Sequence, residues 1–134
     1  MKTFDVQNIE IAAPAEEAYK YIADPGNLPQ WTHAFASADA SSAVMRTPMG
    51  EVAIKLTTRC DAGTGSVDWT MKFPDESVGR AYSRVVPTDR DRCVYTFVLL
   101  APPVPLEALE GALAVQIEIL AKELKALKAL VEGK

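Results

Sequence analysis

His33 is the only histidine of this chain, and it stands between two aromatic residues, Trp31 and Phe35. Because alternate residues of a β-strand point to the same face, this spacing predicts three rings together on one strand face. An imidazole changes its charge near neutral pH, so His33 could orient a ligand or move a proton. The alternative is a histidine packed among aromatic rings, with its nitrogens bonded to backbone or water. A lone histidine without neighbouring cysteines or a carboxylate pattern does not predict a metal site.

Further charged and aromatic residues occur on two neighbouring β segments, with Asp68 on one and Arg80, Tyr82 and Arg84 on the other. If the latter three faced the interior, they could anchor a carboxylate or hydroxyl group of a ligand. Burial of an arginine without a partner is costly, so the sequence favours both arginines on the solvent side. Asp68, Tyr82 and His33 are the candidates for proton transfer if the protein is an enzyme.

Other catalytic and cofactor motifs are missing from the sequence. No Gly-x-Ser-x-Gly segment surrounds a serine, and no phosphate-binding loop occurs, so neither a serine hydrolase nor a nucleotide-binding protein is predicted. Because no set of acids and bases converges, the catalytic residues are unknown. We expect no cofactor and no metal.

Length and composition predict a single domain over residues 1–134, because 49% hydrophobic residues are enough for one core. The formal net charge is -4 with no basic patch, so we expect no nucleic-acid partner. No apolar run is long enough to span a membrane, and no secretory signal is apparent. Two cysteines without metal-binding spacing suit a reducing, cytoplasmic location.

The last quarter of the chain predicts one long α-helix from Pro105 to Glu132. Pro105 suits the first helical position, and Gly133 suits the C-cap. The large apolar residues recur every three or four positions, which places them in one stripe along the helix. A helix of this kind needs a broad apolar surface to lie on. The stripe consists of Leu106, Leu109, Leu113, Ile117, Leu120, Leu124, Leu127 and Val131.

The residues before this helix alternate between apolar and polar, which predicts antiparallel strands joined by short turns. Residues 3–12 predict a strand with a bulge near Asn8, where the apolar alternation changes phase. A short helix is expected to begin near Pro14 and to stop at Asp24, and residues 27–30 suit another helical turn. The remaining strands are expected at residues 31–36, 43–47, 51–60, 66–73, 77–86 and 93–100.

The segment from Ile9 to Asp24, IEIAAPAEEAYKYIAD, and the PGNLPQW segment that follows it resemble the opening of the SRPBCC superfamily. This superfamily includes the START domains, the Bet v 1-like plant proteins and the polyketide cyclase/dehydrase-like bacterial proteins. The order of elements fits as well, so the resemblance covers nearly the whole chain. It implies the helix-grip fold, an α+β fold. In that fold a curved seven-stranded antiparallel sheet wraps around a long C-terminal helix, and two short helices lie between the first two strands.

The resemblance also implies a cavity between sheet and helix that holds a lipid, polyketide or other apolar molecule. We therefore expect binding of a small hydrophobic ligand, without integral membrane association, by a monomer or homodimer. A polyketide cyclase/dehydratase-like enzyme using the same cavity is the alternative, and a regulatory protein-binding role is a third. The residues expected to contact the ligand are Trp31, His33, Phe35, Leu56, Trp69, Met71, Tyr82, Leu109, Leu113 and Ile117.

Two further expectations depend on this fold. In the superfamily's strand order Cys60 and Cys93 would lie three strands apart, roughly 14 Å, whereas a disulfide needs Cα atoms within about 7 Å. The resemblance therefore implies free thiols. Gly111 costs about 1 kcal/mol relative to alanine inside a helix, so it needs a reason, which is either the close approach of another backbone or space left by small residues around it. We predict that the cavity lies under residues 106–117 and that residues 120–131 pack tightly against the sheet.

Overall fold

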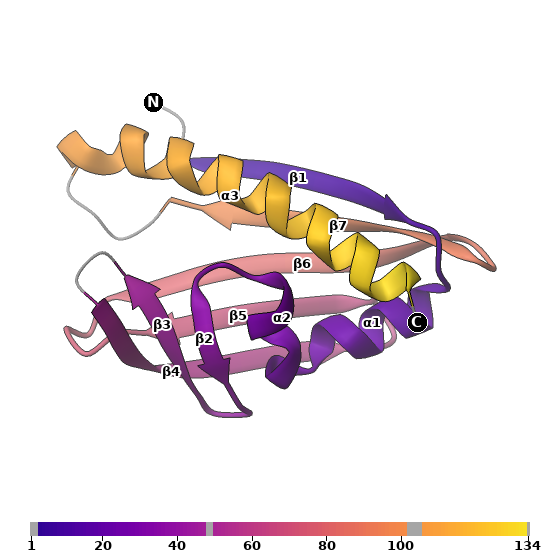
Figure 1. Cartoon of the computed structure of the whole chain (residues 1–134), viewed down its shortest axis with the longest axis horizontal. Coiled ribbons are helices and arrows are strands. Elements are labelled where there is room, and N and C mark those ends of the chain that lie inside the picture. The colour runs from indigo at the N-terminus through magenta and orange to yellow at the C-terminus, as the bar shows by residue number, and fades with distance from the viewer. Residues whose placement is uncertain (1–2, 48–49, 102–105, 134) are drawn as a thin grey trace.

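The computed structural model describes residues 3–47, 50–101 and 106–133, and its side chains exclude Thr47 and residues 106–111. Seven strands and four helical segments follow one another along the chain (Figure 1). Their order is β1 (Phe4–Ile11), α1 (Ala15–Ala23), the 3₁₀ turn η1 (Pro25–Asn27), α2 (Leu28–Trp31), β2 (Phe35–Ala38), β3 (Ser42–Thr47), β4 (Gly50–Asp61), β5 (Ser66–Lys72), β6 (Val78–Asp89), β7 (Arg92–Leu100) and α3 (Leu106–Glu132).

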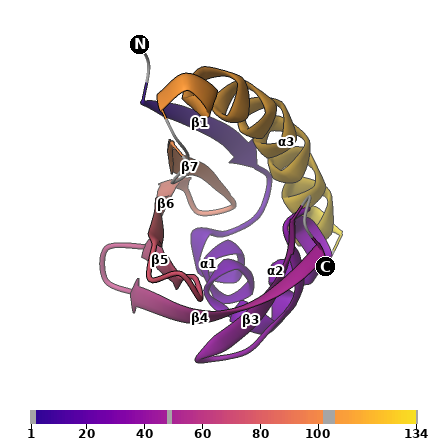
Figure 2. The same ribbon diagram turned by 90° about the vertical axis from the view of Figure 1, so that its left-hand side faces the viewer.

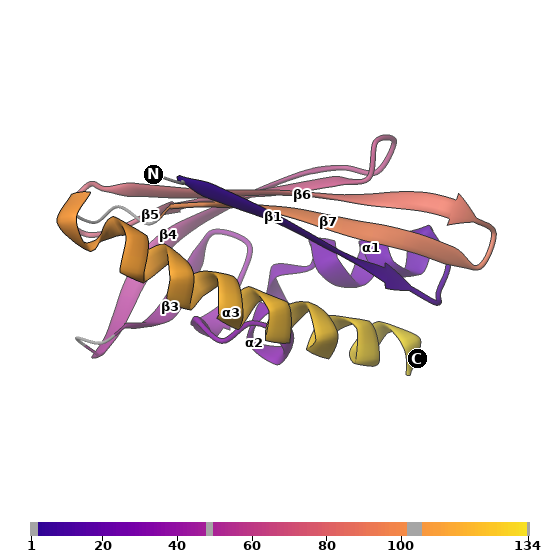
Figure 3. The ribbon, with the colours of Figure 1, turned by 90° about the horizontal axis from the view of Figure 1, so that it is seen from above.

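The strands form one antiparallel sheet in the order β1-β7-β6-β5-β4-β3-β2. Figure 2 shows this sheet curling into a half-barrel, with α3 across its open side and α1 at one end of the enclosed space. Seen from above, α3 runs diagonally along β1, which is the edge strand beside β7 (Figure 3). The expected helix-grip fold is therefore confirmed, with its two short helices between β1 and β2.

The prediction of a bulge in the first strand is wrong. β1 pairs with β7 without interruption from Phe4 opposite Leu100 to Ile11 opposite Cys93. The apolar phase changes because Phe4 and Val6 face outward, 48% and 49% exposed, whereas Ile11 faces the core. A regular strand that carries apolar residues on both of its faces can therefore show the same change of apolar phase as a strand with a bulge.

The prediction that a strand begins at Trp31 is also wrong. Trp31 is the last residue of α2, and the hydroxyl and backbone N–H of Thr32 both donate to Leu28 O, at 2.6 and 2.9 Å. The next strand begins only at Phe35. Trp31, His33 and Phe35 therefore do not share one strand face, because a helix end, a bend and a strand start follow one another there.

Small side chains on β6 make room at the centre of the sheet's inner face. Its inward positions there are Gly79, Ala81 and Ser83, which leave a shallow track between two strands that carry large rings. Trp69 from β5 and Phe97 from β7 meet across this track, with ring centroids 5.9 Å apart in a stacked arrangement. The sheet thus places its largest side chains over its smallest ones, where they interdigitate.

The C-terminal half of α3 packs on the sheet as predicted. Leu120, Leu124, Leu127 and Val131 are all buried in the core, and each contributes about 1.5–3 kcal/mol by leaving water. In the other half Val115 is exposed. The expectation for Gly111 and Leu109 falls outside the described side chains.

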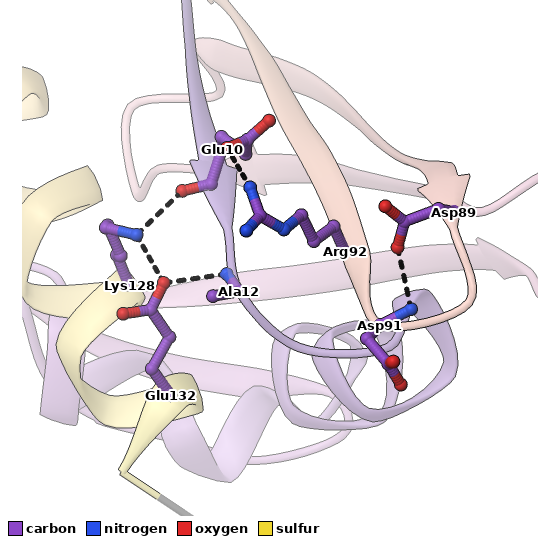
Figure 4. Close-up of polar contacts among 7 residues, drawn as sticks. All are labelled: Glu10, Ala12, Asp89, Asp91, Arg92, Lys128 and Glu132. Atoms are coloured by element: carbon purple, nitrogen blue, oxygen red, sulfur yellow. Dashed lines mark hydrogen bonds and ion pairs between the residues drawn. The ribbon is translucent and has the colours of Figure 1, made fainter.

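Polar contacts fasten the end of α3 to β1, as Figure 4 shows. Lys128 Nζ donates to Glu10 O at 3.0 Å and pairs with the carboxylate of Glu132, and Glu132 Oε2 also accepts from Ala12 N at 2.7 Å. Arg92 on β7 pairs with Glu10 at 3.4 Å. The end of α3 is thereby held beside the C-terminal end of β1, which leads into α1.

Cys60 lies on β4 and Cys93 on β7, three strands apart in the observed order, and both thiols are free. This confirms the expectation from the resemblance. Among the described residues, no helix has the length and apolar character needed to cross a membrane.

Candidate functional site

Four aromatic rings form a connected cluster between the sheet and the helices. Trp31 comes from α2, whereas Trp69, Tyr95 and Phe97 come from the inner face of β5 and β7. The ring centroid of Trp31 lies 6.4 Å from that of Trp69 and 6.3 Å from that of Tyr95. Tyr95 meets Phe97 edge to face at 6.3 Å. These separations and tilts are those that aromatic pairs favour, so we call this group the aromatic cluster.

Buried polar atoms without hydrogen bonds gather at this cluster. They are Nε1 of Trp31, Nε1 of Trp69, the hydroxyl of Tyr95 and Oγ1 of Thr58, and each lacks a partner among the described residues. Thr58 lies directly opposite Trp69 in the β4–β5 pairing. Since buried polar groups almost always have partners, four such atoms in one place call for an explanation.

Ser83 is a polar neighbour of the Tyr95 hydroxyl; its Oγ donates to Val67 O at 2.6 Å and keeps lone pairs that can accept a hydrogen bond. Burial raises the pKa of Tyr95 far above its ordinary value, and the charges of Asp68 and Glu123 raise it further, while Ser83 opposes this. The phenol therefore stays protonated and can donate a hydrogen bond.

A cleft of about 340 Å³ opens from solvent onto this cluster, between α2 with its following bend and α3. That volume lies at the lower end of the range for small-molecule sites, about 300–1,000 Å³. Trp31 belongs to both the cleft wall and the aromatic cluster, so its ring separates the two. The lining residues are Gln30, Trp31, Thr32, His33, Ile119, Lys122, Glu123 and Ala126.

Glu123 is a carboxylate held in this cleft by an unusual contact. Its Oε2 accepts a hydrogen bond from the backbone N–H of His33 at 2.5 Å. Burial raises the pKa of Glu123 from 4.5 to about 6, although the bond from His33 works in the opposite direction. The group therefore exchanges its proton close to neutral pH, as a general acid or base must.

The bend that carries His33 is fixed from both sides. Arg46 of β3 donates from Nη1 to the carbonyl oxygens of His33 and Phe35 at 3.2 and 3.3 Å, and its backbone N–H donates to Ala34 O at 2.7 Å. Glu123 holds the same bend from the helix side. The mouth of the cleft is thus positioned by contacts with both the sheet and α3.

A second cleft of about 350 Å³ lies between α1 and the end of α3. Glu17, Lys20, Tyr21, Asn27 and Val131 line it, and most of these side chains are polar. Tyr21 donates to Gln30 Oε1 at 2.5 Å and Asn27 donates to Tyr21 O at 3.0 Å. Because no residue of the aromatic cluster lines this cleft, and its Tyr21 and Asn27 are already hydrogen-bonded, we regard the first cleft as the candidate site.

The structure brings some predicted site residues together and separates others. Trp31 and Trp69 meet in the cluster, and Phe35 and Leu56 are buried in the same core. Met71 and Ile117 are partly buried, and Leu113 is 3% exposed. Leu109 lies outside the described side chains. The cleft borders residues 119–126 of α3, further along the helix than the predicted stretch 106–117.

Two predicted positions are wrong. His33 is exposed at the mouth of the cleft, because its side chain leaves the bend toward solvent while Trp31 turns inward. Tyr82 is 41% exposed on the outer face of β6, because Ala81 and Ser83 on either side of it point inward. Arg80 and Arg84 share that outer face, as the cost of burying them predicts.

Sequence reasoning missed Glu123, Tyr95 and Thr58. Glu123 had a detectable signal, because it lies three residues after Leu120 and four before Leu127, on the flank of the apolar stripe. Tyr95 sits in a strand that reads as apolar on both faces, which hides its inward direction. No group of three His, Cys, Asp or Glu side chains suited to a metal occurs within the part of the chain described.

A polar pair lies on the inner face of β1, beneath the middle of α3. Gln7 Nε2 donates to Asp5 Oδ2 at 2.9 Å and to the carbonyl oxygen of Ile117 at 3.0 Å. Asp5 is buried. This pair ties the edge strand to α3.

Comparison with known families gives one match that spans almost the whole chain. Residues 3–132 match the family described as polyketide cyclase / dehydrase and lipid transport. No curated protein of known function matches the sequence.

Solved structures show the same fold at low sequence identity. A START superfamily protein from Mycobacterium smegmatis superposes with a TM-score of 0.73 at 17% identity, over 98% of this chain and 99% of that one. The ZhuI aromatase/cyclase from Streptomyces sp. R1128 gives 0.66 at 12% identity, over 96% and 93%. The di-domain aromatase/cyclase BexL of the BE-7585A biosynthetic pathway gives 0.76 at 16% identity, over 98% of this chain and 47% of that one. At such identities these likenesses concern the fold alone.

Proposed function

The chain belongs to the polyketide cyclase/dehydrase and lipid transport family, and from that premise we propose that it binds a small apolar ligand between its sheet and α3. The ligand enters through the cleft beside Trp31 and rests against the aromatic cluster. The observation that carries this proposal is the shared position of Trp31, which walls a 340 Å³ cleft on one side and meets Trp69 and Tyr95 on the other.

The proposed contacts come from three directions. Trp31 and Ile119 form the cleft wall, Trp69 and Leu56 form the floor on the sheet, and Leu113 extends the apolar surface along α3. Met71, Phe35 and Ile117 complete the proposed contact set. His33 stands at the rim, where it can contact a polar end of the ligand without being buried.

The binding proposal is tested by filling the cleft. Ala126 is exposed and lines the cleft, so Ala126→Phe should block it with little effect on stability. Ala121→Phe is the matched control, since Ala121 is an exposed alanine of the same helix that does not line the cleft. Trp31 and Trp69 are the only tryptophans of the chain, so their fluorescence reports directly on an uncharged apolar probe such as N-phenyl-1-naphthylamine.

We expect quenching or energy transfer in the wild type and in Ala121→Phe, and at least a tenfold weaker response in Ala126→Phe. Native mass spectrometry of the purified protein should also show a carried-over small molecule. An equal response in all three proteins would contradict the proposed site. No response in any of them, with no carried-over mass, would contradict ligand binding itself.

A second candidate function is favoured by Glu123. A carboxyl group with a pKa of about 6 at the wall of the cleft can take a proton from a bound substrate and return it. The protein would then act as a cyclase or dehydratase on a linear poly-β-ketone, with Glu123 in place of His33, Tyr82 or Asp68. Ring formation from such a substrate can be monitored by absorbance. It should be lost in Glu123→Gln and kept in Glu118→Gln. Turnover that survives in Glu123→Gln would rule out this role.

A further inference from the structure

We propose that the bend between α2 and β2, residues 32–34, is a gate over the candidate cleft, and that the carboxylate of Glu123 is the latch that holds it shut. The gate controls how fast a molecule from solvent enters the cleft, as closing loops do at many binding sites. Because this cleft is the entrance in the proposed function, the gate rests on that function.

The bend forms part of one wall of the cleft, and α3 forms the other. Thr32 and His33 of the bend line the cleft together with Trp31, whereas Ile119 and Ala126 line it from α3. The width of the cleft therefore depends on the separation between the bend and the helix. A bend held against α3 narrows the entrance, and a bend released from α3 widens it.

The bend is held more firmly on its β3 side than on its α3 side. Arg46 of β3 donates from Nη1 to the carbonyl oxygens of His33 and Phe35 at 3.2 and 3.3 Å, and from its backbone N–H to Ala34 O at 2.7 Å. Toward α3 the described residues make one hydrogen bond, from the backbone N–H of His33 to Oε2 of Glu123 at 2.5 Å. Loss of this single contact frees the bend from α3 while β3 still holds it.

The latch is a buried group that changes its charge. With the bend shut, burial raises the pKa of Glu123 from 4.5 to about 6, although the bond from His33 lowers it. With the bend open, water reaches the carboxyl and its pKa returns toward the ordinary value. The shut state therefore binds a proton more tightly than the open state does. Rising pH should open the gate, by up to about thirtyfold in the ratio of open to shut molecules.

No ion pair neutralises the latch in the part of the chain that the structure describes. The charged or titratable groups on the elements around it are His33 on the bend, Arg46 on β3, Asp68 on β5, Tyr95 on β7 and Lys122 on α3. The guanidinium of Arg46 is directed at backbone oxygens of the bend. Ionisation of Glu123 in the shut state therefore stays costly, which is what couples the gate to pH.

Hydrogen exchange can test the latch directly, because its donor is a backbone amide. The protection factor of the His33 amide, measured by NMR, gives the ratio of shut to open molecules. The amide of Thr32 is the internal control, because it donates to Leu28 O at the end of α2. Glu123→Gln keeps an uncharged acceptor, Glu123→Ala removes the acceptor, and Glu118→Gln removes an exposed carboxylate of the same helix.

In the wild type and in Glu118→Gln, the protection factor of His33 should fall roughly fifteenfold from pH 4.5 to pH 7.5, while that of Thr32 stays constant. It should stay high at both pH values in Glu123→Gln and low at both in Glu123→Ala. An imidazole also titrates near neutral pH, so His33→Gln should keep the fall at this position. Loss of the fall in His33→Gln, or a wild-type protection factor that does not depend on pH, would overturn the latch.

Access to the cleft is tested by stopped-flow mixing with N-phenyl-1-naphthylamine, which is uncharged over this pH range. Its association rate constant should rise with pH in the wild type, stay low in Glu123→Gln and stay high in Glu123→Ala. Equal rate constants in all three proteins, despite the expected exchange, would overturn the gate. Binding of the probe by none of them would contradict the proposed function, and the exchange data would still decide whether Glu123 latches the bend.

Discussion

The backbone N–H of His33 donates to Oε2 of Glu123 over 2.5 Å, which joins the bend after α2 to the side of α3. This contact draws a carboxylate into a largely apolar wall beside Trp31. It gives the protein a titrating group at the mouth of its candidate site, and its effect on stability can be measured.

Glu123 should make the protein less stable as pH rises. Its pKa is about 6 in the folded state against an ordinary 4.5, so between these values the folded state holds a proton that the unfolded state has lost. Stability therefore falls through this window, by about 2 kcal/mol once the group is ionised. Glu123→Gln should be the more stable protein above pH 7, and this advantage should vanish near pH 4. Urea unfolding of both proteins across this pH range measures the difference between their free energies of unfolding.

The exposed Glu118, on the same helix, provides the control for that titration. Glu118→Gln should follow the wild-type dependence on pH. A Glu123→Gln variant whose advantage does not change between pH 4 and pH 7 would show that the carboxyl is not perturbed by burial.

Tyr95→Phe should leave the unliganded protein as stable as the wild type, or stabilise it by up to about 1 kcal/mol. The reason is that it removes a buried hydroxyl without a hydrogen bond. Tyr21→Phe is the contrasting variant, since the Tyr21 hydroxyl donates to Gln30 at 2.5 Å, and its loss should cost about 1 kcal/mol. Thermal unfolding of the two variants and of the wild type compares their stabilities. A clear loss of stability in Tyr95→Phe would mean that an ordered water or other group already satisfies this hydroxyl.

Leu124→Ala should be more destabilising than Leu113→Ala. Leu124 belongs to the core under the C-terminal half of α3, so its truncation should cost about 2–5 kcal/mol. Leu113 is buried but stands outside that core, so its truncation should cost less and should change the affinity for an apolar probe. Chemical unfolding and probe titration measure the two effects. If Leu113→Ala proves the more destabilising and binding is unaltered, Leu113 does not border the ligand site.

Cys60 and Cys93 should react with a thiol reagent at very different rates. Cys60 is exposed on β4 and Cys93 is completely buried on β7. Burial raises the pKa of both thiols, so even Cys60 should react slowly at neutral pH. Labelling of the native protein should give one modification, absent from Cys60→Ser, and a second should appear only on unfolding. Two modifications at equal rates would contradict the packing of β7 described above.

Most of the fold could be predicted from the sequence alone. The apolar stripe of the last quarter, the alternation along the strands and the opening segment up to Trp31 predicted one curved sheet around one long helix. These patterns are reliable because the periods of a helix and of a strand follow from backbone geometry, which no tertiary contact alters. The burial of Leu120, Leu124 and Leu127 and the outward direction of Arg80 and Arg84 follow from the same local rules.

The candidate site, in contrast, depends on contacts between segments that are distant in the sequence. Whether Trp31 ended a helix or began a strand depended on the hydrogen bonds that Thr32 donates to Leu28 O, and this placed Trp31 inside and His33 outside. The candidate proton carrier is Glu123, about 90 positions from His33 in the sequence. Its proximity arises because α3 crosses the open side of the half-barrel. Pairing across such a distance leaves no local pattern, because the pKa of a carboxyl and the partner of an indole N–H depend on what the fold brings beside them.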